Sequence, residues 1–411
     1  MNAFMSANIL LPKDVDMEKW AVIACDQFTS DRAYWQRVRS NAGSEPSTIH
    51  LILPEAELSG DRKAAVSAIN AAMEDYYNAG VFAEYENAYI YVERTLENGA
   101  IRPGLVGMVD LEEYDYNPGS VSPIRATEKT VLERIPPRKE IRKDAPLEFP
   151  HVLMLSDDHE GCLIEPITAI KDQLPLVYDF DLMEQGGHIK GWLLQGEAAK
   201  AFDHRFTAYA ETIDDKYIGL SGAKVLLAVG DGNHSLATAK SCYEELKANN
   251  PGADLSNHPA RYALVELENI HDPSQVFEPI HRVITGVDTA ALLGYLRGFC
   301  ADDGFEVGYC AGKEKGVLKL DKTRGELAVA VLQELLDDFL ADNAGEIDYI
   351  HGEEEVSALA AVEDAIGFLP PAMGKGQLFR GVIDRGVLPR KTFSMGHARE
   401  KRYYLEGRKI K

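Results

Sequence analysis

The sequence has no long apolar run and no closely spaced pair of cysteines. No window approaches the ~18 uninterrupted apolar residues that a membrane-spanning helix needs. The N-terminal stretch MNAFMSANILLPKDVDMEKW also lacks a basic segment followed by an apolar core. The five cysteines are widely spaced and form no CxxC pair, which excludes the common metal and redox motifs. We therefore expect reduced thiols and a cytoplasmic protein that is neither secreted nor inserted in a membrane.

Positive charge is scarce. Lysine and arginine together number 43, against 66 aspartates and glutamates, and the formal net charge is −23. A surface of this sign repels phosphate backbones, so we expect no nucleic-acid partner and no membrane partner. The acidic balance indicates solubility first of all. The expected partner is a small molecule, and the sequence predicts no oligomeric state.

The alternation of short apolar runs with amphipathic stretches predicts a mixed α/β fold, a mixed sheet with flanking helices. Its 411 residues, 45% of them hydrophobic, allow one large core or two ordinary ones. We treat 1–411 as a single unit, with a possible α/β core over 1–285 and a helix-rich part over 286–411. The expected strands are 49–53, 88–93, 105–110, 152–156, 225–229 and 262–266. The expected helices are 62–78, 197–212, 235–248, 289–300, 326–341 and 371–384. Two stretches rich in proline and charge, 135–148 and 248–258, are expected to be loops.

The stretch VLLAVGDGNHSLATAK (225–240) predicts a buried strand, a polar turn and a helix. A helix start carries unsatisfied N–H groups and partial positive charge, and glycines let a ligand approach the backbone. The turn 230–235 is therefore a candidate phosphate site, built by Gly230, Gly232, Asn233 and Ser235. Asp231 is a candidate ligand of Mg²⁺ or acceptor of a hydroxyl proton, and His234 a candidate phosphate donor or proton shuttle.

An ordinary structural interpretation fits the same residues. Asn233 or Ser235 can cap the helix, and Asp231 can stabilise the turn. The turn is not a Walker loop, because no Gly-Lys-Ser/Thr ends it, and it lacks the third glycine of a dinucleotide fingerprint.

Five segments, in order, resemble the bacterial and archaeal domain-of-unknown-function family 1015, some of whose members are associated with phosphorylation of free serine. The segments are GLVGMVDLEEY (104–114), ATEKTVLERIPPR (126–138), GDGNHSLATA (230–239), LENIHDPSQVFEPIHRVI (267–284) and GVLPRKTFSM (386–395). The turn is also similar to the phosphate-binding corner of the ParB and sulfiredoxin superfamily. Sulfiredoxin itself is excluded, because its nucleophilic cysteine would fall at Asn233 and an amide cannot act as that nucleophile.

The sequence departs from the family at two positions of the turn, where Asn233 replaces a histidine and Ser235 replaces an arginine. Since an arginine fork binds phosphate better than a hydroxyl, another cation must substitute or the ligand differs. The candidates for that cation are Arg138, Arg142, Arg282 and Lys391.

The resemblance assigns roles to residues outside the turn. Glu128 is a candidate general base toward an alcohol, against a solvated or salt-bridged glutamate. Asp26, in ACDQFTSDRAYW (24–35), matches a family aspartate and is a candidate contact for a substrate amine or a metal. His281 and Arg282 are candidate substrate contacts, although a buried structural histidine is an equal interpretation.

These observations favour an enzyme that uses ATP or ADP with Mg²⁺ to phosphorylate a small hydroxylated substrate such as free serine. A non-catalytic nucleotide or small-ligand binding protein is the alternative, because Asn233 and Ser235 replace family residues. A ParB-like DNA-binding protein is disfavoured by the charge and by the lack of a basic recognition helix.

Overall fold

The computed structural model describes residues 3–220 and 222–411. Over these residues the chain divides into two compact units. Unit 1 comprises the described residues up to Gln275 together with Gly396–Lys411, and unit 2 comprises Val276–Met395. The division lies close to the possible boundary at 285 considered above, but the chain returns to unit 1 after residue 395. Within the described residues, no helix is both long and apolar enough to cross a membrane.

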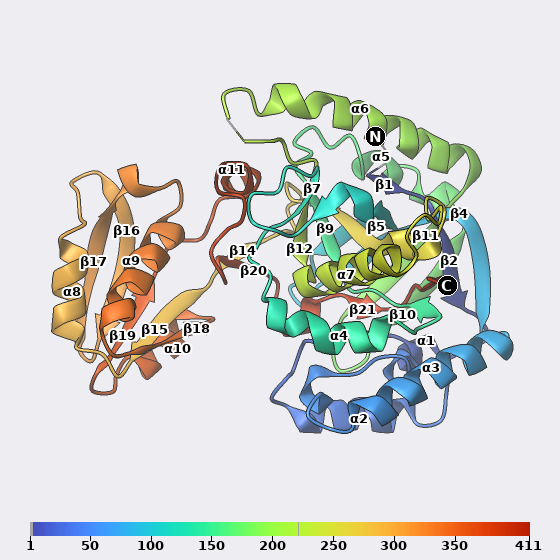
Figure 1. Ribbon diagram of the computed structural model, residues 1–411, viewed down its shortest axis with the longest axis horizontal. Helices are drawn as coiled ribbons and strands as arrows, with labels where there is room; N and C mark the ends of the chain where they lie inside the picture. The colour runs from blue at the N-terminus through green and yellow to red at the C-terminus, as the bar shows by residue number, and fades with distance from the viewer. Residues whose placement is uncertain (1–2, 221) are drawn as a thin grey trace. The chain divides into compact units, whose positions relative to one another are not determined.

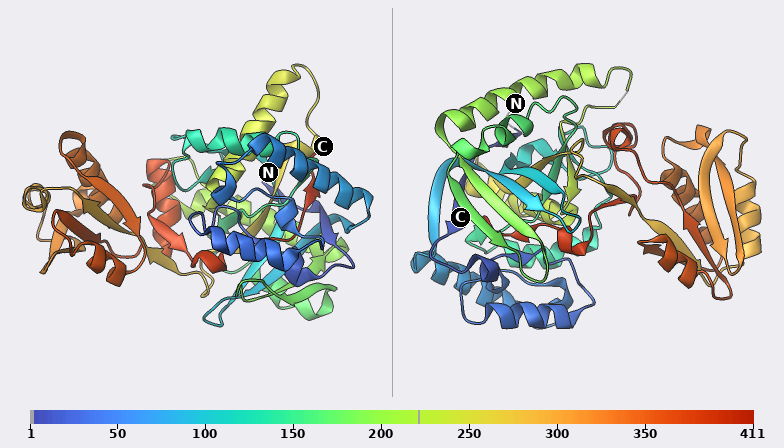
Figure 2. Two further views of the ribbon diagram at one scale, coloured as in Figure 1. Left: turned by 90° about the horizontal axis from the view of Figure 1, so that it is seen from below. Right: turned by 180° about the vertical axis from the view of Figure 1, so that it is seen from behind.

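A large mixed sheet forms the centre of unit 1 (Figure 1). Its strands are β1 (Phe4–Met5), β2 (Ala7–Pro12), β4 (Phe82–Thr95), β5 (Ile101–Asp110), β6 (Tyr114–Asp115), β7 (Ile124–Ala126), β9 (Leu153–Ser156), β10 (Leu176–Asp181), β11 (His188–Leu194), β12 (Leu227–Asp231) and β13 (Tyr262–Asn269). The main path runs β10-β11-β4-β5-β13-β9-β12-β7-β6, with β1 beside β5 and β2 beside β4. The hairpin of β10 and β11 is at one end of this path (Figure 2). Strand β12 is antiparallel to β9 and parallel to β7, and this pairing fixes where the predicted turn emerges from the sheet.

Helices and two small strand pairs complete unit 1. The helices are α1 (Met17–Trp20), α2 (Arg32–Ala42), α3 (Arg62–Asn78), α4 (Ile135–Arg142), α5 (Glu165–Thr168), α6 (Gly196–Lys216) and α7 (Asn233–Asn249). The small pairs join β3 (Val22–Ile23) to β21 (Tyr403–Tyr404), and β8 (Leu147–Glu148) to β22 (Arg408–Lys409). Both pairs tie the C-terminal segment, which follows unit 2, into the core of unit 1.

Unit 2 is a smaller sheet with helices on both faces. Its elements are β14 (Phe277–Pro279), β15 (His281–Thr285), α8 (Thr289–Arg297), β16 (Gly304–Ala311), β17 (Glu314–Asp321), α9 (Ala328–Asp342), β18 (Glu346–Ile350), α10 (Glu353–Leu359), β19 (Ala365–Leu369), α11 (Lys375–Arg385) and β20 (Phe393–Met395). Ile284 packs with α8 and α9, whereas its neighbour Val283 packs with α10. Because adjacent strand residues face opposite sides, α10 covers the face away from α8 and α9.

Most of the expected elements form near their predicted bounds, and the mixed α/β class is confirmed. Helix α3 matches 62–78, and α9 buries the stripe of Val331, Leu335 and Phe339 as its spacing predicts. Strands form within or across the ranges expected at 88–93, 105–110, 152–156, 225–229 and 262–266.

Two predictions of local structure are wrong. The apolar run 49–53 is not a strand: a short 3₁₀ helix covers Thr48–His50, with the Ser47 side chain accepting the Ile49 N–H, and the following leucines are buried without sheet pairing. The stretch 135–148 is not a loop, because it forms α4 and β8. Its two prolines occupy the first helical turn, where the missing N–H groups cost nothing and the fixed φ suits a helix.

Candidate functional site

The predicted strand, turn and helix form as expected around Gly232. Strand β12 ends at Asp231, Gly232 takes a left-handed φ of +79°, and α7 begins at Asn233. A Cβ at Gly232 would lie 3.0 Å from the Cα of Val152, so a side chain there would push the turn and the residue before β9 apart by a few tenths of an ångström. Among the described residues no side chain caps the start of α7. The start of α7 thus has the local form that the sequence predicts, a glycine turn followed by a helix N-terminus without a side-chain cap.

Asn233 and His234 hold a neighbouring segment of the chain. The Asn233 Oδ1 accepts the N–H of Thr127 at 3.3 Å, and the His234 Nε2 accepts the N–H of Val131 at 3.2 Å. The half-buried Glu128 lies on the segment between these two attachments. Asn233 and His234 thus hold the segment that carries Glu128 against the start of α7.

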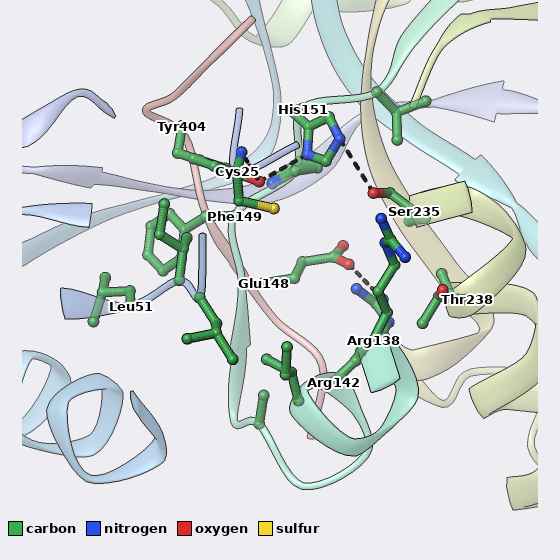
Figure 3. Close-up of a pocket in the computed structure, with 18 of the residues that line it drawn as sticks. Cys25, Leu51, Arg138, Arg142, Glu148, Phe149, His151, Ser235, Thr238 and Tyr404 are labelled. Atoms are coloured by element: carbon green, nitrogen blue, oxygen red, sulfur yellow. Dashed lines mark hydrogen bonds and ion pairs between the residues drawn. The ribbon is translucent and has the colours of Figure 1, made fainter. Parts of the chain in front are cut away.

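A pocket opens along α7 from its first turn, with a volume of about 150 Å³ (Figure 3). We call it the α7 pocket. Its lining is mostly apolar and comes from the segment at 51–58, α4, the chain leading into β9, and α7. The polar residues that line it are Cys25, Glu55, Arg138, Arg142, Glu148, His151, Ser235, Thr238 and Tyr404. Of the turn residues predicted to bind phosphate, Ser235 is the one that lines this pocket.

A buried histidine links Ser235 to the C-terminal segment (Figure 3). His151 places Nε2 3.2 Å from the Ser235 Oγ and Nδ1 2.9 Å from the Tyr404 hydroxyl. The Tyr404 oxygen also accepts the N–H of Cys25 at 3.1 Å. The Asp26 Oδ2 lies 3.6 Å from the same Nε2. A carboxylate, an imidazole and a hydroxyl therefore meet where the pocket reaches the first turn of α7.

Lys401 contacts the carboxylate of Asp231 in the turn and acts through its charge on that of Asp26. The Lys401 Nζ lies 3.3 Å from the Asp231 Oδ2, while the Asp231 Oδ1 accepts the Gly232 N–H at 2.9 Å. Burial by itself raises the pKa of Asp26, but the charge and hydrogen bond of His151, a hydrogen bond from Gln27 and the charge of Lys401 hold that pKa below its usual range. Asp26 therefore stays ionised at neutral pH.

The other charged and nucleophilic groups of the pocket are already engaged. Arg138 forms an ion pair with Glu55 and donates to the carbonyl of Arg134 at 2.8 Å. Arg142 pairs with the buried Glu148. Burial, helped by the nearby charge of Asp26, raises the pKa of Cys25 to about 11, so the thiol stays protonated and is a poor nucleophile.

Three predicted site residues belong to unit 2. Arg282 is fully buried and donates to the Gln333 Oε1 at 3.1 Å and to the carbonyl oxygens of Ile280 and Arg390. His281 is also buried, and Lys391 is exposed with a left-handed φ of +55°. The Arg282–Arg390 contact shows that the Pro-x-His-Arg and Pro-Arg-Lys segments lie side by side within unit 2.

Sequence reasoning missed three residues of the site: His151, Lys401 and Tyr404. His151 stands in the short link between β8 and β9, where nothing in the sequence sets it apart. Lys401 and Tyr404 lie about 170 residues after the turn, and the pairing of β21 with β3 helps bring them back to it. The one available signal was the mixed basic and aromatic run KRYY at 401–404.

The described residues contain no cluster of three or more histidine, cysteine or acidic side chains able to hold a metal ion by itself. A Mg²⁺ ion is often held by one or two carboxylates together with substrate phosphates. Asp231 is a single carboxylate whose Oδ1 accepts the Gly232 N–H and whose Oδ2 pairs with Lys401, so it does not form a resident metal site by itself.

The fold and the turn define a mixed α/β protein with a strand, turn and helix corner suited to an anion. The chain belongs to the family described as "Protein of unknown function (DUF1015)", whose model matches residues 9–363. No curated protein matches it.

Several solved structures resemble the chain at a distance. One is SbnI with a C-terminal truncation from Staphylococcus aureus, at 11% identity, covering 71% of this chain and 82% of that chain, with a TM-score of 0.36. Another is a free serine kinase in complex with AMP, at 12% identity, covering 72% of this chain and 93% of that chain, with a TM-score of 0.35. A third is a conserved hypothetical protein from Pyrococcus furiosus, at 11% identity, covering 71% and 91%, with a TM-score of 0.33. Likenesses this distant say nothing about the site.

Proposed function

We propose that the protein is a nucleotide-dependent phosphotransferase that moves a phosphoryl group from ATP or ADP to a small hydroxylated metabolite, with free serine the first acceptor to test. The observation that carries the proposal is the uncapped start of α7, which opens beside a largely apolar pocket. Main-chain N–H groups and the helix dipole suit the phosphates, and apolar side chains such as Leu51, Met73 and Phe149 suit the base.

Phosphoryl transfer depends mainly on position and on neutralised charge. In the proposed reaction the acceptor hydroxyl gives its proton to Glu128 and its oxygen attacks the terminal phosphorus. The bond to the bridging oxygen breaks, and the shortened nucleotide leaves. Asp231 would hold the Mg²⁺ carried by the nucleotide, and that ion would supply further charge neutralisation. His234 and Asn233 keep the segment of Glu128 against α7.

A nucleotide-binding protein without catalysis is the second candidate. The observation in its favour is that Asn233 and His234 both accept backbone N–H groups of the segment 127–131. Side chains that stabilise a loop in this way need not touch a ligand, and the turn would then keep its backbone cradle without the chemistry.

The experiment measures binding and turnover separately. Purified protein is titrated with ATP, ADP and AMP in the presence of Mg²⁺, and its melting temperature is followed. The same mixtures are incubated with free serine and a panel of other amino acids and sugars, and products are sought by mass spectrometry. A phosphorylated product supports the phosphotransferase. Nucleotide stabilisation without any product supports the binding protein, and the absence of both contradicts the two candidates.

A further inference from the structure

Lys401 reaches the turn from the segment that follows unit 2. It comes directly after the short 3₁₀ helix Ala398–Glu400, and its side chain is only 12% exposed. Its Nζ stands 3.3 Å from the Asp231 Oδ2, and its charge also acts on Asp26. A lysine this buried beside Asp231 places a positive charge at the turn.

The three arginines weighed for the turn are engaged by other partners. Arg138 pairs with Glu55, and Arg142 pairs with Glu148. Arg282 is buried among acceptors of its own unit. Lys401, which the sequence did not suggest, places its charged atom against the turn residue Asp231.

A bound phosphate would add negative charge beside Asp231, which already carries one. An ammonium group has three donors, so Lys401 can keep its contact with Asp231 and still donate to a phosphate oxygen. It needs no fork geometry to do so, because lysine acts on phosphate as a point charge. We propose that Lys401 is the cation that binds the nucleotide phosphates at the turn, in place of an arginine from α7. The proposal rests on the proposed function.

The test measures the affinity of Mg²⁺·ADP and of pyrophosphate by calorimetry for the wild type and for four variants. Lys401→Met removes the charge and Lys401→Arg keeps it. Lys401→Met combined with Ser235→Arg returns a cation at the first turn of α7, where position 235 faces the pocket (Figure 3). Lys240→Met is the matched control, because Lys240 is 14% exposed, lies on α7 and pairs with Glu244 away from the turn.

Because Lys401→Met removes one charge-assisted hydrogen bond, we expect it to lower the affinity for Mg²⁺·ADP and for pyrophosphate by about tenfold to a hundredfold. We expect Lys401→Arg, and the variant with Ser235→Arg, to recover most of that loss, while Lys240→Met binds like the wild type. Melting temperatures are measured alongside. If Lys401 were purely structural, Lys401→Met would lower the melting temperature, and adding Ser235→Arg would not restore the affinity.

The outcomes separate the two claims. If the wild type binds neither ligand, the proposed function and the role of Lys401 both fail. If the wild type binds and Lys401→Met binds equally well, only the role of Lys401 fails. A loss of affinity that neither arginine restores, at an unchanged melting temperature, also contradicts it.

Discussion

The two units contain family-like segments of similar composition but place them in opposite surroundings. In unit 1 the GDGNHS turn ends a strand beside an open pocket, and its first helical turn has no side-chain cap. In unit 2 the His281–Arg282 pair is buried, and the guanidinium of Arg282 is surrounded by protein acceptors. Polar motif residues can therefore lie beside a pocket or be buried within the fold, and their neighbours decide which.

The largest expected effect comes from Arg282. Replacing it with alanine leaves the carbonyls of Ile280 and Arg390 without their donor and opens a cavity, which should destabilise unit 2 by roughly 3–5 kcal/mol. Hydrogen exchange of the β15 amides during a urea titration measures this loss. Arg390→Ala is the control, since Arg390 is exposed over the Tyr349 ring and should cost less than about 1 kcal/mol. Equal effects of the two substitutions would remove the contrast between the units.

The next effect depends on pH and concerns a buried carboxylate of unit 1. Burial raises the pKa of Glu268 from 4.5 to about 7, although Arg102 lies 2.9 Å away. Folded unit 1 then binds more protons than the unfolded chain between pH 4.5 and 7. Its free energy of unfolding should therefore fall as the pH rises through this window, by up to about 3 kcal/mol. Glu268→Gln should flatten the profile, and an unchanged slope would contradict the assignment.

Unit 2 should respond to pH in the opposite direction. Burial, together with the charges of Arg282 and His351, lowers the pKa of His281 below 6.5, against the opposing charge of Glu353. The unfolded chain then binds more protons just below pH 6.5, so unit 2 should lose stability as the pH falls. Exchange of the β15 amides from pH 7.5 to 5 measures this, and His281→Gln should remove most of the dependence. If the free energy of unfolding changed with pH in the same direction in both units, Glu268 and His281 would not determine the pH dependence.

The smallest expected effect compares two glycines of unit 1. Gly232 and Gly252 both have left-handed φ values, +79° and +88°, but a Cβ at Gly232 meets Val152 whereas one at Gly252 meets open space. Alanine at either position should cost about 1–2 kcal/mol of backbone strain. Only Gly232→Ala should also weaken nucleotide binding, because it displaces the turn. Thermal unfolding and calorimetry measure the two quantities, and equal affinities in both variants would mean that the turn is not the binding site.

Local patterns in the sequence predicted most of the fold. The strand of β12, the turn and α7 follow from five apolar residues, glycines and a helix-forming run. The wrong predictions arose where context decides. Pro136 and Pro137 begin α4 instead of interrupting it, and the apolar residues 51–53 line the α7 pocket instead of pairing in a sheet.

The site was less predictable than the fold. Its turn is local in sequence, and Asn233 and His234 accept N–H groups of the segment that carries Glu128. Pairings between residues as far as 379 positions apart, such as the Cys25–Tyr404 hydrogen bond, bring His151, Tyr404 and Lys401 to the site. The spacing of apolar residues in the sequence does not indicate such a pairing. The engagement of Arg138 by Glu55 is likewise a property of packing.

Hydrogen exchange with and without Mg²⁺·ADP tests the central claim most directly. If phosphates bind the first turn of α7, the amides of 230–236 should gain protection on addition of the nucleotide, while those of β15 in unit 2 stay unchanged. Protection confined to other segments, with exchange at 230–236 unaltered at saturating nucleotide, would contradict the account.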